Sequence, residues 1–135
     1  MPQSDALFVV TDRYELLALW RLVAEAKFQS DPDDRDLWGS PYVHALATRI
    51  AKAMLDDHQN MGDQDAIERH VRWKQSLPNN VVLPTIRANL LRDASEKWWL
   101  AMSKEEKVAY VRGCVAPFEP NDDFISTLLQ DAETG

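Results

Sequence analysis

Few side chains in this sequence have the types and spacing that catalysis or metal binding requires. The three histidines are His44, His58 and His70, and the only cysteine is Cys114. His44 and His58 fall on one predicted helix about 21 Å apart along its axis, which is too far to share an ion. Cys114 lies near a predicted helix C-terminus, where the helix dipole does not lower a thiol pKa. We therefore expect no catalytic residues, no metal site and no cofactor.

One run, residues 57–68, partly matches a calcium-binding loop. It places Asp57, Gly62 and Glu68 at loop positions 1, 6 and 12. Positions 3 and 5 hold a glutamine and a methionine, and a methionine side chain offers no oxygen to a hard cation. We expect instead a helix that ends near Gly62 and a new helix that is capped by Asp63.

Charge is unevenly distributed along the 135 residues, although the net charge is only −7. Residues 1–68 carry a net charge of −7, residues 69–112 carry +5, and residues 113–135 carry −5. These blocks either neutralise one another as surface ion pairs, each worth ~0–1 kcal/mol, or present separate faces to partners. The first interpretation is favoured, because nucleic-acid modules are usually basic overall.

The chain has five tryptophans, and two of them suggest an interface. Trp38 follows the acidic segment 31–36, and Trp99 lies outside the apolar arc of its predicted helix. Both rings either complete the core, which we favour by a small margin, or anchor a partner. The partner-binding residues on the second interpretation are Asp31, Asp33, Asp34, Asp36, Trp38 and Trp99.

The basic middle of the chain offers a different candidate interface. No acidic residue occurs between Arg69 and Arg92, a pattern typical of a surface that binds the phosphate groups of a nucleic acid. The nucleic-acid-binding residues on this interpretation are Arg69, Arg72, Lys74, Arg87 and Arg92.

Helical periodicity and stop signals predict an all-α bundle of five to six helices. The predicted helices cover 12–28, 40–60, 63–76, 84–102 and 103–115, with a last one from Asn121 or Asp122. Apolar residues surround nearly the whole of helix 12–28, so we expect this first helix to be buried. Residues 30–40 are expected as a loop, and 81–83 as a short extended segment.

The length fits a single helical domain over residues 1–135, with 1–11 and 130–135 as flexible arms. No apolar run, such as 6–10 or 16–20, exceeds five residues, which is too few for a signal peptide or a membrane helix. One cysteine cannot form an intrachain disulfide. We therefore expect a cytoplasmic protein without a membrane partner.

Three hypotheses for function follow. The preferred one is a non-enzymatic, cytoplasmic protein–protein interaction module, of the inhibitor, immunity, accessory or adaptor type, which presents an acidic, Trp-containing surface to a basic partner. The alternative is a nucleic-acid-associated regulator that uses the basic segment 69–92. The third, ranked lower, is an enzyme or small-ligand protein with a pocket lined by His44, His58 and His70. The sequence leaves the oligomeric state open.

Overall fold

The computed structural model describes residues 6–29 and 35–135, and these form helices and connecting turns without strands. The all-α fold class is therefore confirmed. The elements are α1 (Arg13–Lys27), α2 (Arg35–Gly39), α3 (Pro41–Met61), α4 (Gln64–Lys74), the 3₁₀ helix η1 (Leu77–Asn79), α5 (Leu83–Asp93), α6 (Lys97–Leu100), α7 (Lys104–Val115) and α8 (Asp122–Thr134).

Local capping signals explain where most helices begin. The Asp12 carboxylate accepts hydrogen bonds from two backbone N–H groups of the first turn of α1. The Ser40 hydroxyl caps α3, whose first residue is Pro41. Ser103 and Glu106 form the reciprocal capping box of α7. These helix starts agree with the sequence prediction.

The partial calcium-binding run is a helix–turn–helix, as its capping residues predict. Gly62 ends α3 with a positive φ of 66°, a conformation that glycine adopts without steric cost. The Asp63 carboxylate then accepts a hydrogen bond from the backbone N–H of Ala66 and caps α4. The turn between α3 and α4 is therefore explained by backbone geometry.

Four segments differ from the prediction. Residues 35–39 of the expected loop form α2, and the expected helix 84–102 is split by a turn at 94–96 into α5 and α6. Residues 81–82 form a turn instead of an extended segment. Residues 130–134, expected as a flexible arm, continue α8. The additional short helices raise the number of α-helices in the described residues to eight.

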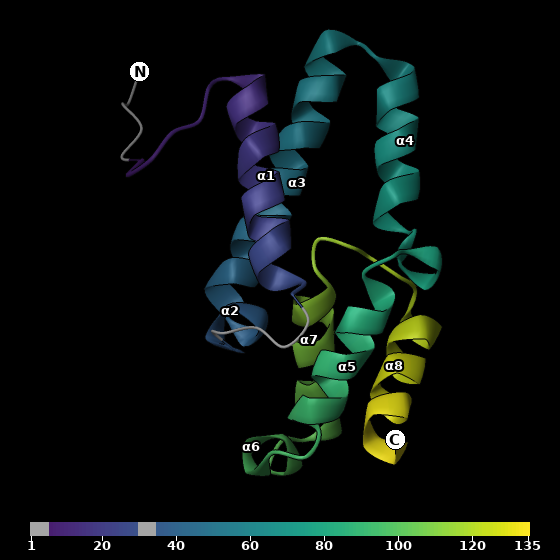
Figure 1. The fold of residues 1–135 in the computed structure, drawn as a ribbon. Helices are drawn as coiled ribbons and strands as arrows, with labels where there is room; N and C mark the ends of the chain where they lie inside the picture. Colours follow the sequence, from purple (N-terminus) through teal and green to yellow (C-terminus); the bar gives the residue numbers. More distant parts are fainter. Residues whose placement is uncertain (1–5, 30–34) are drawn as a thin grey trace.

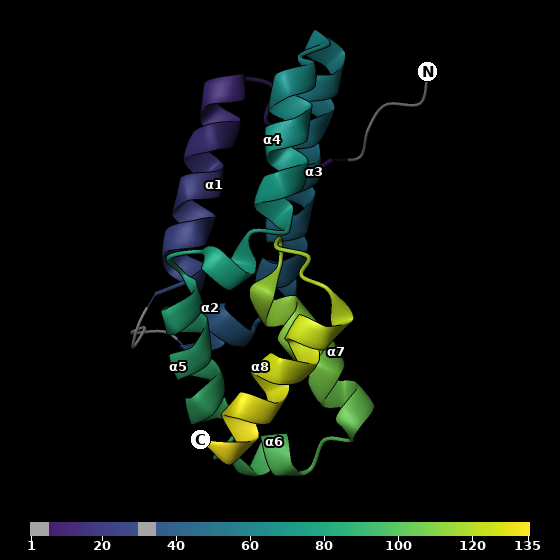
Figure 2. The same ribbon diagram turned by 90° about the vertical axis from the view of Figure 1, so that its right-hand side faces the viewer.

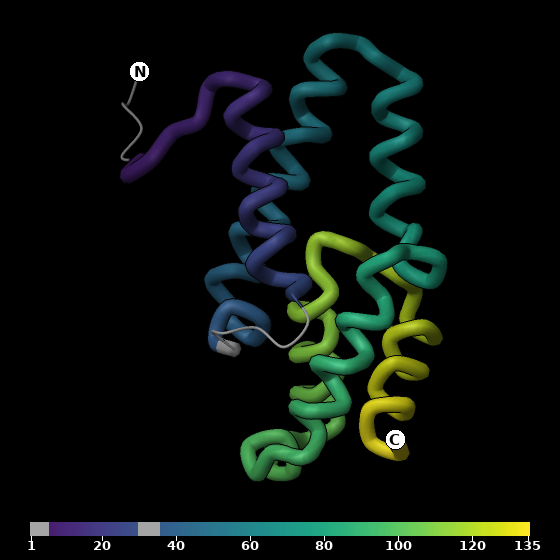
Figure 3. The backbone as a smooth tube through the Cα atoms, in the orientation of Figure 1, coloured from purple at the N-terminus to yellow at the C-terminus, as the bar shows by residue number. Residues whose placement is uncertain are grey.

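The helices are arranged in two tiers (Figure 1). In the upper tier α1 lies along α3, and α4 runs back down beside α3. In the lower tier α8 packs on α5 and α7, with α6 at the bottom end (Figure 2). Figure 3 shows the N-terminal residues from 6 onward leaving the top of α1, away from both tiers. Among these residues, Leu7 and Phe8 are exposed.

The core lies mainly in the lower tier. Its buried apolar side chains come chiefly from α5, α7 and α8, and Trp38 and Trp99 belong to the same cluster. The predicted burial of the first helix is not confirmed, since Lys27 is its only buried residue and Leu22 is 70% exposed. The apolar surface of α1 faces α3, and its Trp20 ring also meets Trp73 of α4 at a centroid distance of 5.4 Å, whereas Leu22 faces solvent.

A buried lysine joins the two tiers. The Lys27 amine, at the end of α1, donates hydrogen bonds to the carbonyl oxygens of Gly113 and Cys114, at 2.9 and 2.5 Å. These carbonyls belong to the last turn of α7, where a cation is favoured by the helix dipole. The amine also lies 5.0 and 5.8 Å from the ring centroids of Phe28 and Trp38. Burial lowers the Lys27 pKa from 10.5 to about 7.

We predict that Lys27→Met removes a pH dependence of stability. Because the folded-state pKa is lowered to about 7, the unfolded chain binds more protons above that pH, and the free energy of unfolding rises with pH. We expect the wild type to gain stability between pH 7 and pH 9. The upper limit is the ordinary pKa of the Cys114 thiol, because above pH 9 the raised pKa of this buried group lowers the free energy of unfolding. Urea unfolding should show a clearly smaller gain for Lys27→Met, whereas equal gains would contradict the prediction.

A glycine allows α3 and α7 to approach closely. A Cβ atom on Gly113 would lie 2.5 Å from Cδ2 of His44, well inside van der Waals contact. Neither ring nitrogen of His44 has a hydrogen-bond partner among the described residues. Burial, and then the nearby Lys27 charge, lower the His44 pKa to about 3, so the imidazole is neutral at pH 7.

We predict that Gly113→Ala costs about 1–3 kcal/mol of unfolding free energy, because the added methyl overpacks this contact. His44→Ala in the same chain should recover part of the loss, since it removes the clashing ring. A thermal or urea double-mutant cycle measures the coupling. If the losses of unfolding free energy for Gly113→Ala and His44→Ala are additive, the contact between Gly113 and His44 does not limit how closely α3 and α7 pack.

Candidate functional site

The described residues form a surface pocket of about 510 Å³ beside α2. Its walls come from α2, the start of α3, the junction between α5 and α6, and α7. Its side chains include three acidic and four aromatic residues, namely Asp36, Asp93, Glu96, Trp38, Tyr42, Trp98 and Tyr110. None of the lining residues in the described part of the chain is basic.

Asp93 fixes the inner part of this pocket. Its Oδ2 atom accepts hydrogen bonds from the Trp38 indole N–H at 2.8 Å and from the Tyr110 hydroxyl at 2.7 Å. One carboxylate therefore connects α2, α5 and α7. Because α5 ends at Asp93 and the chain turns at 94–96, the short α6 brings Trp98 to the rim and Trp99 into the core.

Burial determines the protonation behaviour of these groups. It raises the pKa of Asp93, while the hydrogen bonds from Tyr110 and Trp38 act in the opposite direction. Burial also raises the pKa of Tyr110. Behind the pocket, burial raises the pKa of the Cys114 thiol to about 12, so this cysteine is protonated at pH 7.

The outer part of the pocket is aromatic. Trp98 and Tyr110 form a corner, with ring centroids 5.3 Å apart and an interplanar angle of 61°. Trp98 is 45% exposed and Tyr42 is 81% exposed, so both rings are available to solvent. The corner presents an aromatic face beside carboxylates, an arrangement that attracts cations.

The residues of the predicted acidic surface have separate positions. Asp36 is exposed and lines the pocket. Trp38 is 2% exposed and supplies the pocket wall from inside. Trp99 is fully buried, and its indole N–H donates to the Glu133 carboxylate at 3.3 Å. Neither tryptophan presents its ring to solvent, because both complete the core. Asp31, Asp33 and Asp34 lie outside the described residues.

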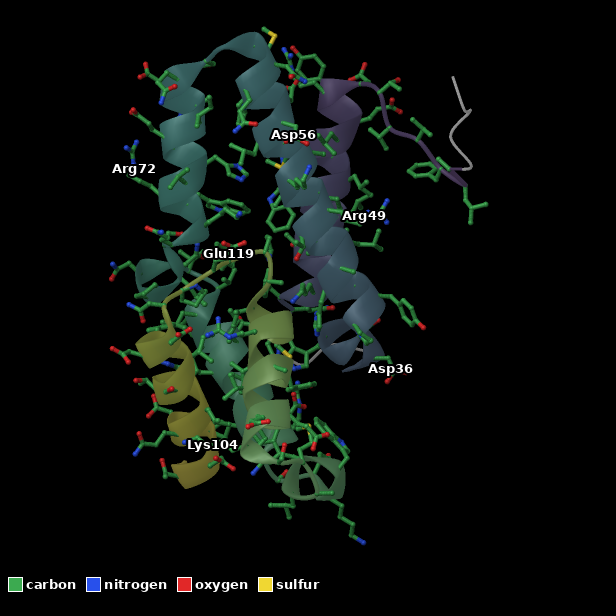
Figure 4. The ribbon with its side chains drawn as sticks, turned by 180° about the vertical axis from the view of Figure 1, so that it is seen from behind. Asp36, Arg49, Asp56, Arg72, Lys104 and Glu119 are labelled. Atoms are coloured by element: carbon green, nitrogen blue, oxygen red, sulfur yellow. The ribbon has the colours of Figure 1, made fainter. Side chains whose placement is uncertain are left out.

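The predicted basic residues are divided between the two tiers. Arg69 and Arg72 lie on α4, and Arg87 and Arg92 lie on α5, where the Arg92 guanidinium donates to the Asn89 side chain. Lys74, on α4, pairs with Glu119 at 3.1 Å. Figure 4 shows Arg72 pointing outward from α4, on the opposite side of the molecule from Asp36.

Two of the three histidines meet between α3 and α4. The rings of His58 and His70 lie 6.1 Å apart, centroid to centroid, and His44 lies elsewhere against Gly113. His58 lines a second pocket of about 480 Å³, but His70 is not among the residues that line it. Within residues 6–29 and 35–135, no group of three or more possible ligands could hold a metal ion.

Comparisons with known proteins identify no relative. No protein-family model matches the chain, and neither a curated protein nor a solved structure is significantly similar to it. Among the described helices, none combines the length and the apolar character that crossing a membrane requires.

Sequence analysis missed the central residues of this pocket. Asp93 follows the core positions Leu90 and Ile86 by three and seven residues, so it falls on the buried face of its helix. A carboxylate at such a position needs a buried partner, and this is the signal that could have identified it. Its partners could not be assigned, because Trp38 and Tyr110 are distant in sequence.

We predict effects of different size for two substitutions, one at Asp93 and one at its donor Tyr110. Tyr110→Phe removes one of two donors to a buried carboxylate and should cost about 1–3 kcal/mol of unfolding free energy. Asp93→Asn retains a carbonyl oxygen for both donors and removes the buried charge, so it should change stability by less than ~1 kcal/mol at pH 7. Urea unfolding compares them. A larger loss for Asp93→Asn than for Tyr110→Phe would mean that the charge itself holds α2.

Proposed function

We propose that this protein is a non-enzymatic protein–protein interaction module that binds a basic partner at the Asp93 pocket. The observation that carries the proposal is the composition of the pocket, in which aromatic and acidic side chains converge without a lining basic residue. Of the residues predicted for an acidic, Trp-containing surface, this proposal keeps Asp36 at the rim and puts the exposed Trp98, with Tyr42 and Glu96, in the place of the buried Trp38 and Trp99.

The chemistry of these side chains supports a basic partner. Tryptophan and tyrosine are enriched where binding energy concentrates, because they bury a large area with few rotatable bonds. Carboxylates beside them attract positive charge and accelerate association with a basic surface. The pocket volume of about 510 Å³ is also within the range of ligand-binding pockets.

Two observations favour binding over catalysis at this site. The Asp93 carboxylate already accepts two hydrogen bonds from the protein. The nearest thiol, Cys114, is buried and has a pKa of about 12, which disfavours the nucleophilic thiolate. A single buried cysteine also fits the reducing cytoplasm, where we propose that the protein acts.

We expect capture of a protein partner from an extract of the source cells to depend on the pocket rim. Glu96→Lys with Tyr42→Ser reverses one charge and removes one exposed ring, and should reduce capture at least ~10-fold, equivalent to ~1.4 kcal/mol. The measurement is quantitative mass spectrometry of proteins retained by the wild type and by this variant. Capture by the wild type should also weaken as salt rises.

Arg72→Glu is the matched control, because it changes an exposed charge on α4, away from the pocket. It should leave capture unchanged, and circular dichroism should show that both variants are folded. Identical protein sets on wild type and rim variant would contradict the proposal. Retention of nuclease-sensitive nucleic acid that Arg72→Glu abolishes would favour the basic-segment hypothesis instead.

A further inference from the structure

We propose that the Asp93 pocket accepts one arginine side chain of the basic partner, with the Asp93 carboxylate as its counter-ion. This inference rests on the proposed function and specifies the group that is recognised. It uses three features of the pocket: an acceptor oxygen at its inner end, an aromatic corner, and carboxylates that approach from different elements.

The inner end of the pocket offers one unused carboxylate oxygen. Asp93 is 9% exposed and lines the pocket, and both of its hydrogen bonds go to Oδ2. No donor in the described part of the chain bonds Oδ1. Oδ1 is not one of the fully buried polar atoms that lack a partner, so it is open to the pocket, where a carboxylate oxygen can accept a charge-assisted hydrogen bond from a cationic donor. The guest's N–H groups would satisfy it.

The aromatic corner favours a planar cation. The Trp98 and Tyr110 rings meet at 61°, so a flat group can lie against one ring while its edge meets the other. A guanidinium stacks on an aromatic face and keeps its in-plane N–H groups for hydrogen bonds. An ammonium has no plane and holds its own water more strongly, so it gains less here.

The positions of the carboxylates along the chain also favour a cation with several donors. Asp36 lies on α2, Asp93 at the end of α5, and Glu96 just before α6, so they line the pocket from three parts of the chain. Five N–H donors in a rigid fork can serve acceptors in several directions, whereas an ammonium has three donors at one point. Arginine therefore fits these acceptors better than lysine.

Peptide titration of the purified full-length protein tests this proposal. The probes are the blocked tripeptides Gly-Arg-Gly, Gly-Lys-Gly and Gly-citrulline-Gly, in which citrulline has the shape of arginine without its charge. NMR follows the indole N–H signals of Trp38, which donates to Asp93, and of Trp98. We expect the arginine peptide to shift both signals with a Kd on the order of 1 mM, the lysine peptide to bind several-fold more weakly, and the citrulline peptide not to bind.

Two pocket variants and one control locate the binding. Asp93→Asn, which keeps an acceptor for Trp38 and Tyr110, and Glu96→Gln should each weaken the arginine peptide by about tenfold or more. Asp131→Asn removes the same charge from the exposed surface of α8 and should stay within about twofold of wild type. Because Glu96 is at the rim, its variant remains informative if Asp93→Asn proves unstable.

The proposal would be overturned by no shift with any peptide, by equal binding of the arginine and citrulline peptides, or by unchanged binding in both Asp93→Asn and Glu96→Gln. Stronger binding of the lysine peptide would also reject arginine as the guest. In each case, loss of partner capture by the Glu96→Lys and Tyr42→Ser protein would still support the proposed function. The arginine proposal can therefore be wrong while the proposed function is still supported.

Discussion

The hydrogen bonds from the buried Lys27 amine to the last turn of α7 are the interaction on which the arrangement of this protein depends. They join the end of α1, in the upper tier, to the helix that supplies Tyr110 and Cys114 in the lower tier. An amine without solvent must have acceptors, and unsatisfied carbonyls at a helix C-terminus need donors. Each group thus meets the requirement of the other, and α7 is held in the place where Tyr110 reaches Asp93.

The helices that sequence analysis located correctly depend on local signals. Asp12, Ser40 and Asp63 each accept a hydrogen bond from an N–H two or three residues ahead, and the Ser103–Glu106 box spans one turn. Such signals are complete within a few residues, so they can be identified without knowledge of the fold. The same holds for the turn at the end of α3.

The features that sequence analysis missed depend on contacts between distant residues. Helices of five and four residues, such as α2 and α6, are too short to be stable alone and exist because Trp38 and Trp99 are buried. The donors to Asp93 lie 55 and 17 residues away. The apolar pattern of α1 likewise indicates that it packs, but not on how many sides.

The burial of Trp38 also determines how the pocket can move. To swing away from the body, α2 would have to expose an indole ring of about 150–250 Å² and leave Asp93 without one of its donors. Such local unfolding is costly, so the wall formed by α2 is closed in nearly all molecules at any moment. The guest that we propose would therefore enter a pocket whose α2 wall is already in place, and little of its binding energy would be used to order that wall.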